Sequence, residues 1–141
     1  MYVDYNLLMA NSEDVYGSAG TSYADYSIDL KTTGVYSDIG KGRSAVLVVN
    51  VETAFAGTSG SYICFQLLAD IDLTIDGSSR VVAQSGIYNV TELVAGTVIK
   101  VPIPAGSISL FGNTYDHIGV GVATSAQTSS AGTISAFIAL E

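Results

Sequence analysis

Residues 44–55, with the sequence SAVLVVNVETAF, limit the possible folds of this chain more than any other stretch. Six of the seven residues in 45–51 are apolar, and Asn50 is the exception. β-Branched side chains pack well on a pleated sheet, and a continuous apolar run lacks the three-and-four spacing of an amphipathic helix. We therefore expect a central strand whose two faces are both covered, by a second layer or by a partner subunit.

Further apolar or alternating segments follow at even spacing, and glycine or serine turns separate them. They predict about eight strands, at residues 26–30, 44–55, 61–68, 80–83, 87–94, 97–103, 115–124 and 133–140. This pattern favours an all-β fold, a single jelly-roll-like antiparallel β-sandwich with an N-terminal arm. We expect residues 1–24 to form the arm and a loop and residues 25–141 to form the sandwich. The pairing order cannot be read from the pattern.

Several local expectations can be checked against a structure. The Gly- and Ser-rich turn at 56–60 suggests an antiparallel pair between 44–55 and 61–68, while 11–24, 69–79 and 125–132 read as loops. Pro102 and Pro104 lack a backbone N–H, which indicates that the strand at 97–103 lies at a sheet edge. Gly119 and Gly121 alternate with apolar residues, so their face should allow another chain segment to approach closely.

The charge balance argues against direct binding to nucleic acid. Thirteen acidic and five basic residues give a net charge of −8, and affinity for phosphate backbones depends on clustered Lys and Arg. Charged residues make up only 13% of the chain, and nine tyrosines are present. Because protein interfaces are depleted in charge and enriched in Tyr, this composition favours a protein that is packed against others. No apolar run approaches the ~20 residues of a membrane helix, so we expect no membrane association.

No catalytic constellation is evident. His117 is the single histidine, and the single cysteine, Cys64, lies in an apolar segment without a basic neighbour to lower its pKa. Cys64 is most simply a buried small hydrophobe. No glycine-rich loop precedes a helix, so the pattern predicts neither an enzyme nor a cofactor.

The acidic segment 69–79 invites a calcium interpretation, because it contains Asp70, Asp72 and Asp76. Thr74 and Ile75 occupy positions where an EF-hand needs a ligand and a glycine, and no Glu follows. A solvated acidic loop is the default interpretation, and no metal ligands are assigned.

The N-terminal residues Tyr2, Tyr5, Leu7 and Leu8 form an apolar group without a turn signal. They could belong to a first strand, or to an arm that docks on a neighbouring protein. As an arm, they would contact a neighbouring protein or other protomers, and residues 2–9 could be deleted without loss of the fold.

Six segments resemble, in the same order and over nearly the whole chain, the small capsid cement or decoration proteins of tailed bacteriophages, of the Bordetella-phage type. The segments are DYNLLM (4–9), SIDL (27–30), DIGKG (38–42), LVVNVETAF (47–55), LVAGTVIKVPIP (93–104) and SAFIALE (135–141).

This resemblance implies a jelly-roll homotrimer on the outer face of an icosahedral head. There it would clamp neighbouring subunits of the major capsid protein after the shell expands. In that setting, we expect the contacts with the shell or with other protomers to come from Tyr2, Tyr5, Leu7 and Leu8. It also implies synthesis in the cytoplasm of a bacterial host and a final location on the virion surface. Two alternatives stay open: a trimeric receptor-binding or tail-associated virion protein, and a carbohydrate-binding module. The chain contains no Trp as a stacking platform for a sugar, although Tyr could substitute.

Overall fold

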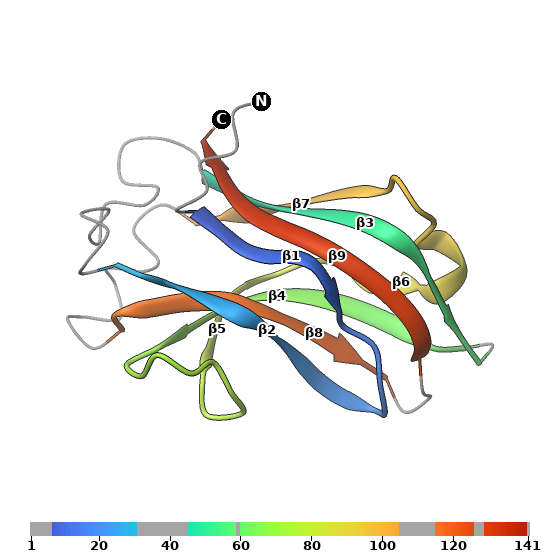
Figure 1. Cartoon of the computed structure of the whole chain (residues 1–141), viewed down its shortest axis with the longest axis horizontal. Coiled ribbons are helices and arrows are strands. Elements are labelled where there is room, and N and C mark those ends of the chain that lie inside the picture. Colours follow the sequence, from blue (N-terminus) through green and yellow to red (C-terminus); the bar gives the residue numbers. More distant parts are fainter. Residues whose placement is uncertain (1–6, 31–44, 59, 105–114, 126–128, 141) are drawn as a thin grey trace.

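Nine β-strands and a short 3-10 helix form two layers in the computed structural model, which describes residues 7–30, 45–58, 60–104, 115–125 and 129–140 (Figure 1). The elements are β1 (Leu8–Asp14), β2 (Gly20–Asp29), β3 (Ala45–Gly57), β4 (Tyr62–Asp70), β5 (Arg80–Gln84), β6 (Tyr88–Asn89), η3 (Val90–Glu92), β7 (Val98–Ile103), β8 (His117–Thr124) and β9 (Ser129–Leu140). Among the described residues, no helix is long and apolar enough to cross a lipid bilayer.

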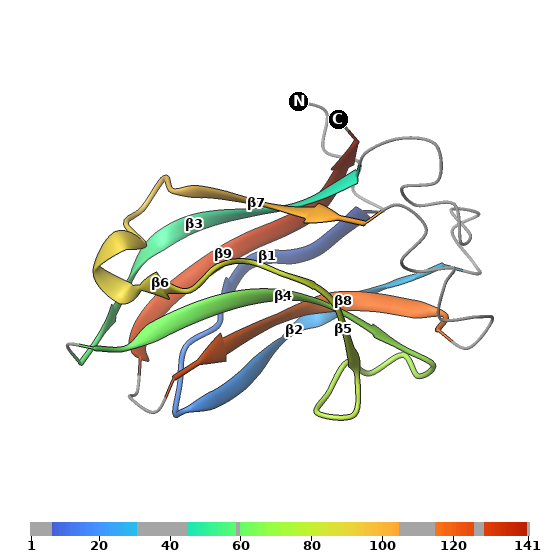
Figure 2. The same cartoon turned by 180° about the vertical axis from the view of Figure 1, so that it is seen from behind.

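The strands form two antiparallel sheets that pack face to face. One sheet has the order β1-β9-β3-β7, and the other has the order β2-β8-β4-β5, with β6 also paired to β4. Apart from the short β6, this is the order of a jelly roll, in which the first strand pairs with the last. In the view from behind, β7 lies above β5 and β6 (Figure 2). β7 and β5 are the edge strands of their sheets at the end opposite β1 and β2. The predicted all-β sandwich is therefore confirmed.

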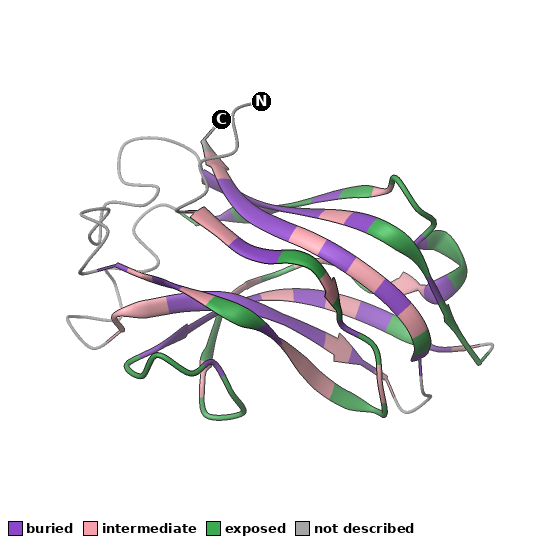
Figure 3. Cartoon of the chain, in the orientation of Figure 1, coloured by how far each residue is buried: buried purple, intermediate pink, exposed green. Residues whose placement is uncertain are grey.

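The core lies between the sheets and is built by alternation along each strand. Leu47, Val49 and Val51 of β3 point inward, where they meet residues such as Phe65 of β4 from the other sheet. On the opposite face of β3, Val46 and Val48 are also buried and form a second cluster with Phe137, Leu8 and Ala139. Figure 3 shows buried positions along the first half of β3 and mostly exposed positions along its second half. The prediction of a central strand covered on both faces is confirmed.

The proline-containing strand behaves as expected. Its counterpart β7 lies at the edge of the first sheet and pairs only with β3, where Pro102 stands opposite Val46. A proline at an edge costs no ladder hydrogen bond when its nitrogen faces away from the neighbouring strand.

Four local predictions were wrong. β3 and β4 do not pair, because the turn between them carries the chain from one sheet to the other. Residues 11–24 are not a loop, since β1 continues to Asp14 and β2 begins at Gly20. β9 begins at Ser129, within the loop expected at 125–132. The strand expected at 87–94 is reduced to two residues, and Asn89 then caps η3 through a capping box with Glu92.

Candidate functional site

The N-terminal residues are used within the protein's own packing as far as the structure describes them. Leu7 is half-buried against the main core, and Leu8 is half-buried against Val46, Val48 and Phe137. Tyr2 and Tyr5 lie outside the described residues. Met9 is fully buried in the core, which argues against the expectation that residues 2–9 could be deleted without loss of the fold.

His117 stands at the beginning of β8, opposite Asp29 on β2 and Asp70 on β4. Its Nε2 lies 3.8 Å from Oδ2 of Asp29, and its buried Nδ1 has no hydrogen-bond partner. Cys64 stands opposite Ala123 on β8, whereas His117 stands opposite Asp70. Cys64 and Asp70 are six residues apart along β4, which corresponds to about 20 Å at 3.3 Å per residue. The structure therefore does not bring the histidine and the cysteine together as a catalytic pair.

Cys64 is half-buried rather than fully buried, because it points away from the core. Its Sγ lies 3.4 Å from the carbonyl oxygen of Ser85, and Ser85 Oγ accepts a hydrogen bond from the N–H of Phe65. These contacts connect β4 to the residue that follows β5, so the Cys64 thiol takes part in the packing of the two strands.

Two carboxylates fix the shape of the acidic loop at residues 71–79. Asp70 directly precedes the loop, and Asp76 lies within it. Asp70 is 5% exposed and accepts hydrogen bonds from Ser79 Oγ at 2.5 Å and from the N–H of Asp72 at 3.1 Å. Asp76 accepts two bonds from Ser78, through its N–H and its Oγ. These bonds lower the pKa of Asp70 and of Asp76 below their ordinary values. In the described part of the chain, no group of three or more His, Cys, Asp or Glu side chains could hold a metal ion.

Replacing Ser79 with alanine should reduce stability in a pH-dependent way. The Ser79 hydroxyl is the main cause of the lowered pKa of Asp70, so the folded state holds the Asp70 proton less tightly than the unfolded state. The stabilisation is therefore complete above the ordinary Asp pKa of about 4, and it is lost as the pH falls through the lowered value. For Ser79→Ala we expect a loss of about 1–2 kcal/mol at neutral pH, measured by urea unfolding.

The same measurement near pH 2 should show a much smaller difference between Ser79→Ala and the parent. Ser78→Ala is the matched control, because it removes a hydroxyl that serves the exposed Asp76. An equal loss for Ser79→Ala at both pH values would contradict the electrostatic explanation.

The acidic loop folds back over the outer face of the second sheet, where Gly119 of β8 leaves room for Ile75. A Cβ atom added at Gly119 would lie 2.6 Å from Cγ1 of Ile75, and one at Gly121 would lie 2.7 Å from Cδ1 of Leu68. Ile75 is only 7% exposed as a result. The predicted close approach on the glycine face is confirmed, and its consequence is a loop held against β8 and β2.

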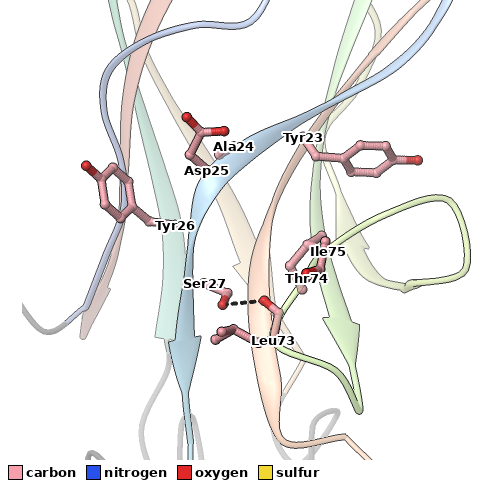
Figure 4. A pocket seen from close by; sticks show the side chains of 8 residues that line it. All are labelled: Tyr23, Ala24, Asp25, Tyr26, Ser27, Leu73, Thr74 and Ile75. Atoms are coloured by element: carbon pink, nitrogen blue, oxygen red, sulfur yellow. Dashed lines mark hydrogen bonds between the residues drawn. The ribbon is translucent and has the colours of Figure 1, made fainter.

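A surface pocket of about 410 Å³ lies between this loop and β2. We call it the β2 pocket; it is lined by Tyr23, Ala24, Asp25, Tyr26, Ser27, Leu73, Thr74 and Ile75 (Figure 4). Ser27 Oγ donates a hydrogen bond of 2.8 Å to the carbonyl oxygen of Leu73 and links the two walls. The β2 wall is irregular, since its pairing with β8 shifts register between Tyr23 and Ser27. Such bulges often re-aim side chains next to binding sites.

Asp25 lies in this bulge, beside a second carboxylate from the other sheet. Its N–H donates to Oε1 of Glu13 on β1. Burial raises the pKa of Glu13, and the negative charge of Asp25 adds to the rise, while the hydrogen bond from the Asp25 N–H acts against it. Two neighbouring carboxylates give the β2 side of the molecule a local excess of negative charge.

Four other exposed apolar side chains lie on β5 and β7 or in the segments that flank β6 and η3. We call this group the apolar edge; it consists of Val81, Ile87, Val94 and Val98, which are 42–73% exposed. The β2 pocket has exposed residues of its own, because Tyr26 is 57% exposed and Leu73 is 68% exposed. Tyr26 and Val81 are separated by the width of a sheet, since β2 and β5 are the two edges of that sheet.

The fold and surface define a jelly-roll β-sandwich with one pocketed, acidic face and one apolar edge. No known protein-family model matches the sequence, and no curated protein matches it either. Sequence reasoning missed the β2 pocket, because the bulge that shapes it has no marker in the run TSYADYS.

Proposed function

We propose that the protein is a capsid cement, or decoration, protein that binds the outer surface of an icosahedral phage head as a homotrimer. In this role it stabilises contacts between subunits of the major capsid protein. Two lines of support converge: the resemblance of six segments to such proteins, and the jelly-roll fold that the resemblance implies. The role needs neither a cofactor nor a catalytic group.

The observation that carries the proposal is the presence of exposed apolar side chains on the apolar edge in addition to the β2 pocket, on one small domain. A trimeric cement protein needs one surface for its own copies and another for the shell. We assign the apolar edge to the copies, because acidic faces of identical copies would repel one another. The acidic face around the β2 pocket is then left for the shell.

A cement protein acts by mass action. Any molecule that binds the assembled shell, and not the separated subunits, shifts the equilibrium toward assembly. Three linked copies strengthen attachment further, because the second and third contacts form at a high effective concentration.

The oligomeric state tests this proposal directly. Three chains of 14.6 kDa should give a particle of about 44 kDa in light scattering. Ile87→Asp should shift the population toward monomer, because Ile87 is 73% exposed in one chain and the new charge would be buried in the trimer. Tyr16→Asp is the control, since Tyr16 is exposed outside the apolar edge. A parent protein that stays monomeric at high concentration would contradict the proposal.

A further inference from the structure

We propose that the β2 pocket is a docking site for an arginine or lysine side chain carried by an extended basic segment of a partner protein. The first argument is charge. Asp25 lines the pocket, Asp72 and Asp76 adjoin the wall residues Leu73 and Ile75, and Asp29 lies on the same strand. Among the described residues, the Lys and Arg side chains are Arg80 and Lys100, and Lys100 lies on β7 in the other sheet. A cationic group is therefore the complementary occupant.

The second argument is the combination of apolar surface and carboxylate. Leu73 and Tyr26 stay largely exposed at the pocket and offer apolar surface beside the carboxylate of Asp25. Arginine and lysine carry long methylene stems that pack on apolar surface while their charged ends stay at a polar rim. A guanidinium can also stack on a tyrosine ring. Such a side chain could cover Leu73 and reach the carboxylate of Asp25.

The same geometry disfavours a sugar as the occupant. A sugar site needs an aromatic platform, but the Tyr23 and Tyr26 rings lie on opposite sides of β2 (Figure 4). The Ser27 hydroxyl already donates to Leu73. The pocket combines the carboxylate of Asp25 with the apolar side chains of Leu73 and Ile75, which fits a cation with a hydrocarbon stem.

The pocket assignment itself is independent of the virion role, but the identity of the partner rests on the proposed function. If the protein is a capsid cement protein, the basic segment belongs to the outer surface of the major capsid protein. Attachment should then weaken as salt is raised, because exposed charge pairs are screened.

The test is an amide NMR titration of the full chain with a short peptide that carries two arginines separated by glycine. A peptide with glutamine in place of arginine is the neutral probe. We expect saturable shifts at residues 23–27 and 73–75 with the arginine peptide alone. Asp25→Asn should weaken binding about fivefold, as should Leu73→Ser. Glu92→Gln removes one charge at η3, where glutamine can still complete the capping box, and should leave binding unchanged.

Three results would overturn the site. In the first, Asp25→Asn binds the arginine peptide as tightly as the parent does. In the second, Glu92→Gln weakens peptide binding as much as Asp25→Asn does. In the third, the same amides shift without the peptide, either with an oligosaccharide or through self-association. The same variants in a pelleting assay with expanded phage heads separate this proposal from the proposed function. Peptide binding at the pocket without attachment to heads would refute the virion role alone. Attachment that both pocket variants leave undiminished would refute the pocket as the shell contact.

Discussion

Phe65→Ala should lower the free energy of unfolding by about 4 kcal/mol, the largest effect we expect from a single substitution. Phe65 is fully buried and joins the two sheets, because its ring meets Phe55 of β3 edge to face, with centroids 6.1 Å apart. It also packs at 6.4 Å against Tyr88 of β6. Removing the ring opens a cavity that both sheets line, so neither sheet can close it alone.

Urea unfolding at neutral pH measures this loss. Phe65→Leu is the control, because it keeps most of the apolar volume and should lose clearly less than Phe65→Ala. A loss below about 1 kcal/mol for the alanine variant would mean that the Phe65 contact does not hold the sheets together.

Gly132→Ala should cost about 3 kcal/mol, for two reasons that add. Gly132 has a φ of +149°, a conformation that residues with a side chain rarely adopt. An added Cβ would also lie 2.6 to 2.8 Å from three ring atoms of Phe55, which is itself 5% exposed and unable to withdraw.

Gly96→Ala separates the two causes. Gly96 has a φ of +89°, but no atom lies within 4 Å of an added Cβ, so only backbone strain is introduced. We expect Gly96→Ala to cost less than Gly132→Ala in thermal or urea unfolding. Shortening Phe55 to leucine in the Gly132→Ala background should recover part of the loss, because it removes the ring. Equal costs for the two glycine variants would contradict the close packing of Phe55 on β9.

The sequence predicted the strands and their faces better than it predicted their partners. A Val-rich run identifies β3 as a covered strand because burial on both faces leaves few polar positions. The turn after β3 contains glycine and serine whether the chain reverses within a sheet or crosses to the other sheet. The hairpin prediction failed for that reason, and the jelly-roll order became visible only in three dimensions.

β1 was partly missed because bulges hide its alternation. Its pairing with β9 shifts register twice, and Ser12 has a positive φ of 51°. Polar residues therefore occupy positions that a regular strand would give to apolar ones. The 3-10 turn, in contrast, had a readable signal, since the sequence NVTE from Asn89 to Glu92 is a capping-box pattern.

The candidate site was predictable only in part. Gly119 and Gly121 indicated a face that another segment could approach, and that segment is the acidic loop with Ile75. The position of the loop against β2 depends on a hydrogen bond between Ser27 and the main chain of Leu73, 46 residues apart. No local pattern encodes such a contact, so the pocket could not be anticipated.

Attachment to expanded heads, formed from the major capsid protein of the same phage, is the measurement that tests the virion role most directly. The purified protein should pellet with such heads up to a saturating ratio, and cryo-electron microscopy should place it in threefold-related groups on the outer surface. Decorated heads should also withstand higher temperatures than bare heads. A protein that stays in the supernatant with expanded heads, and leaves their thermal stability unchanged, would contradict the account.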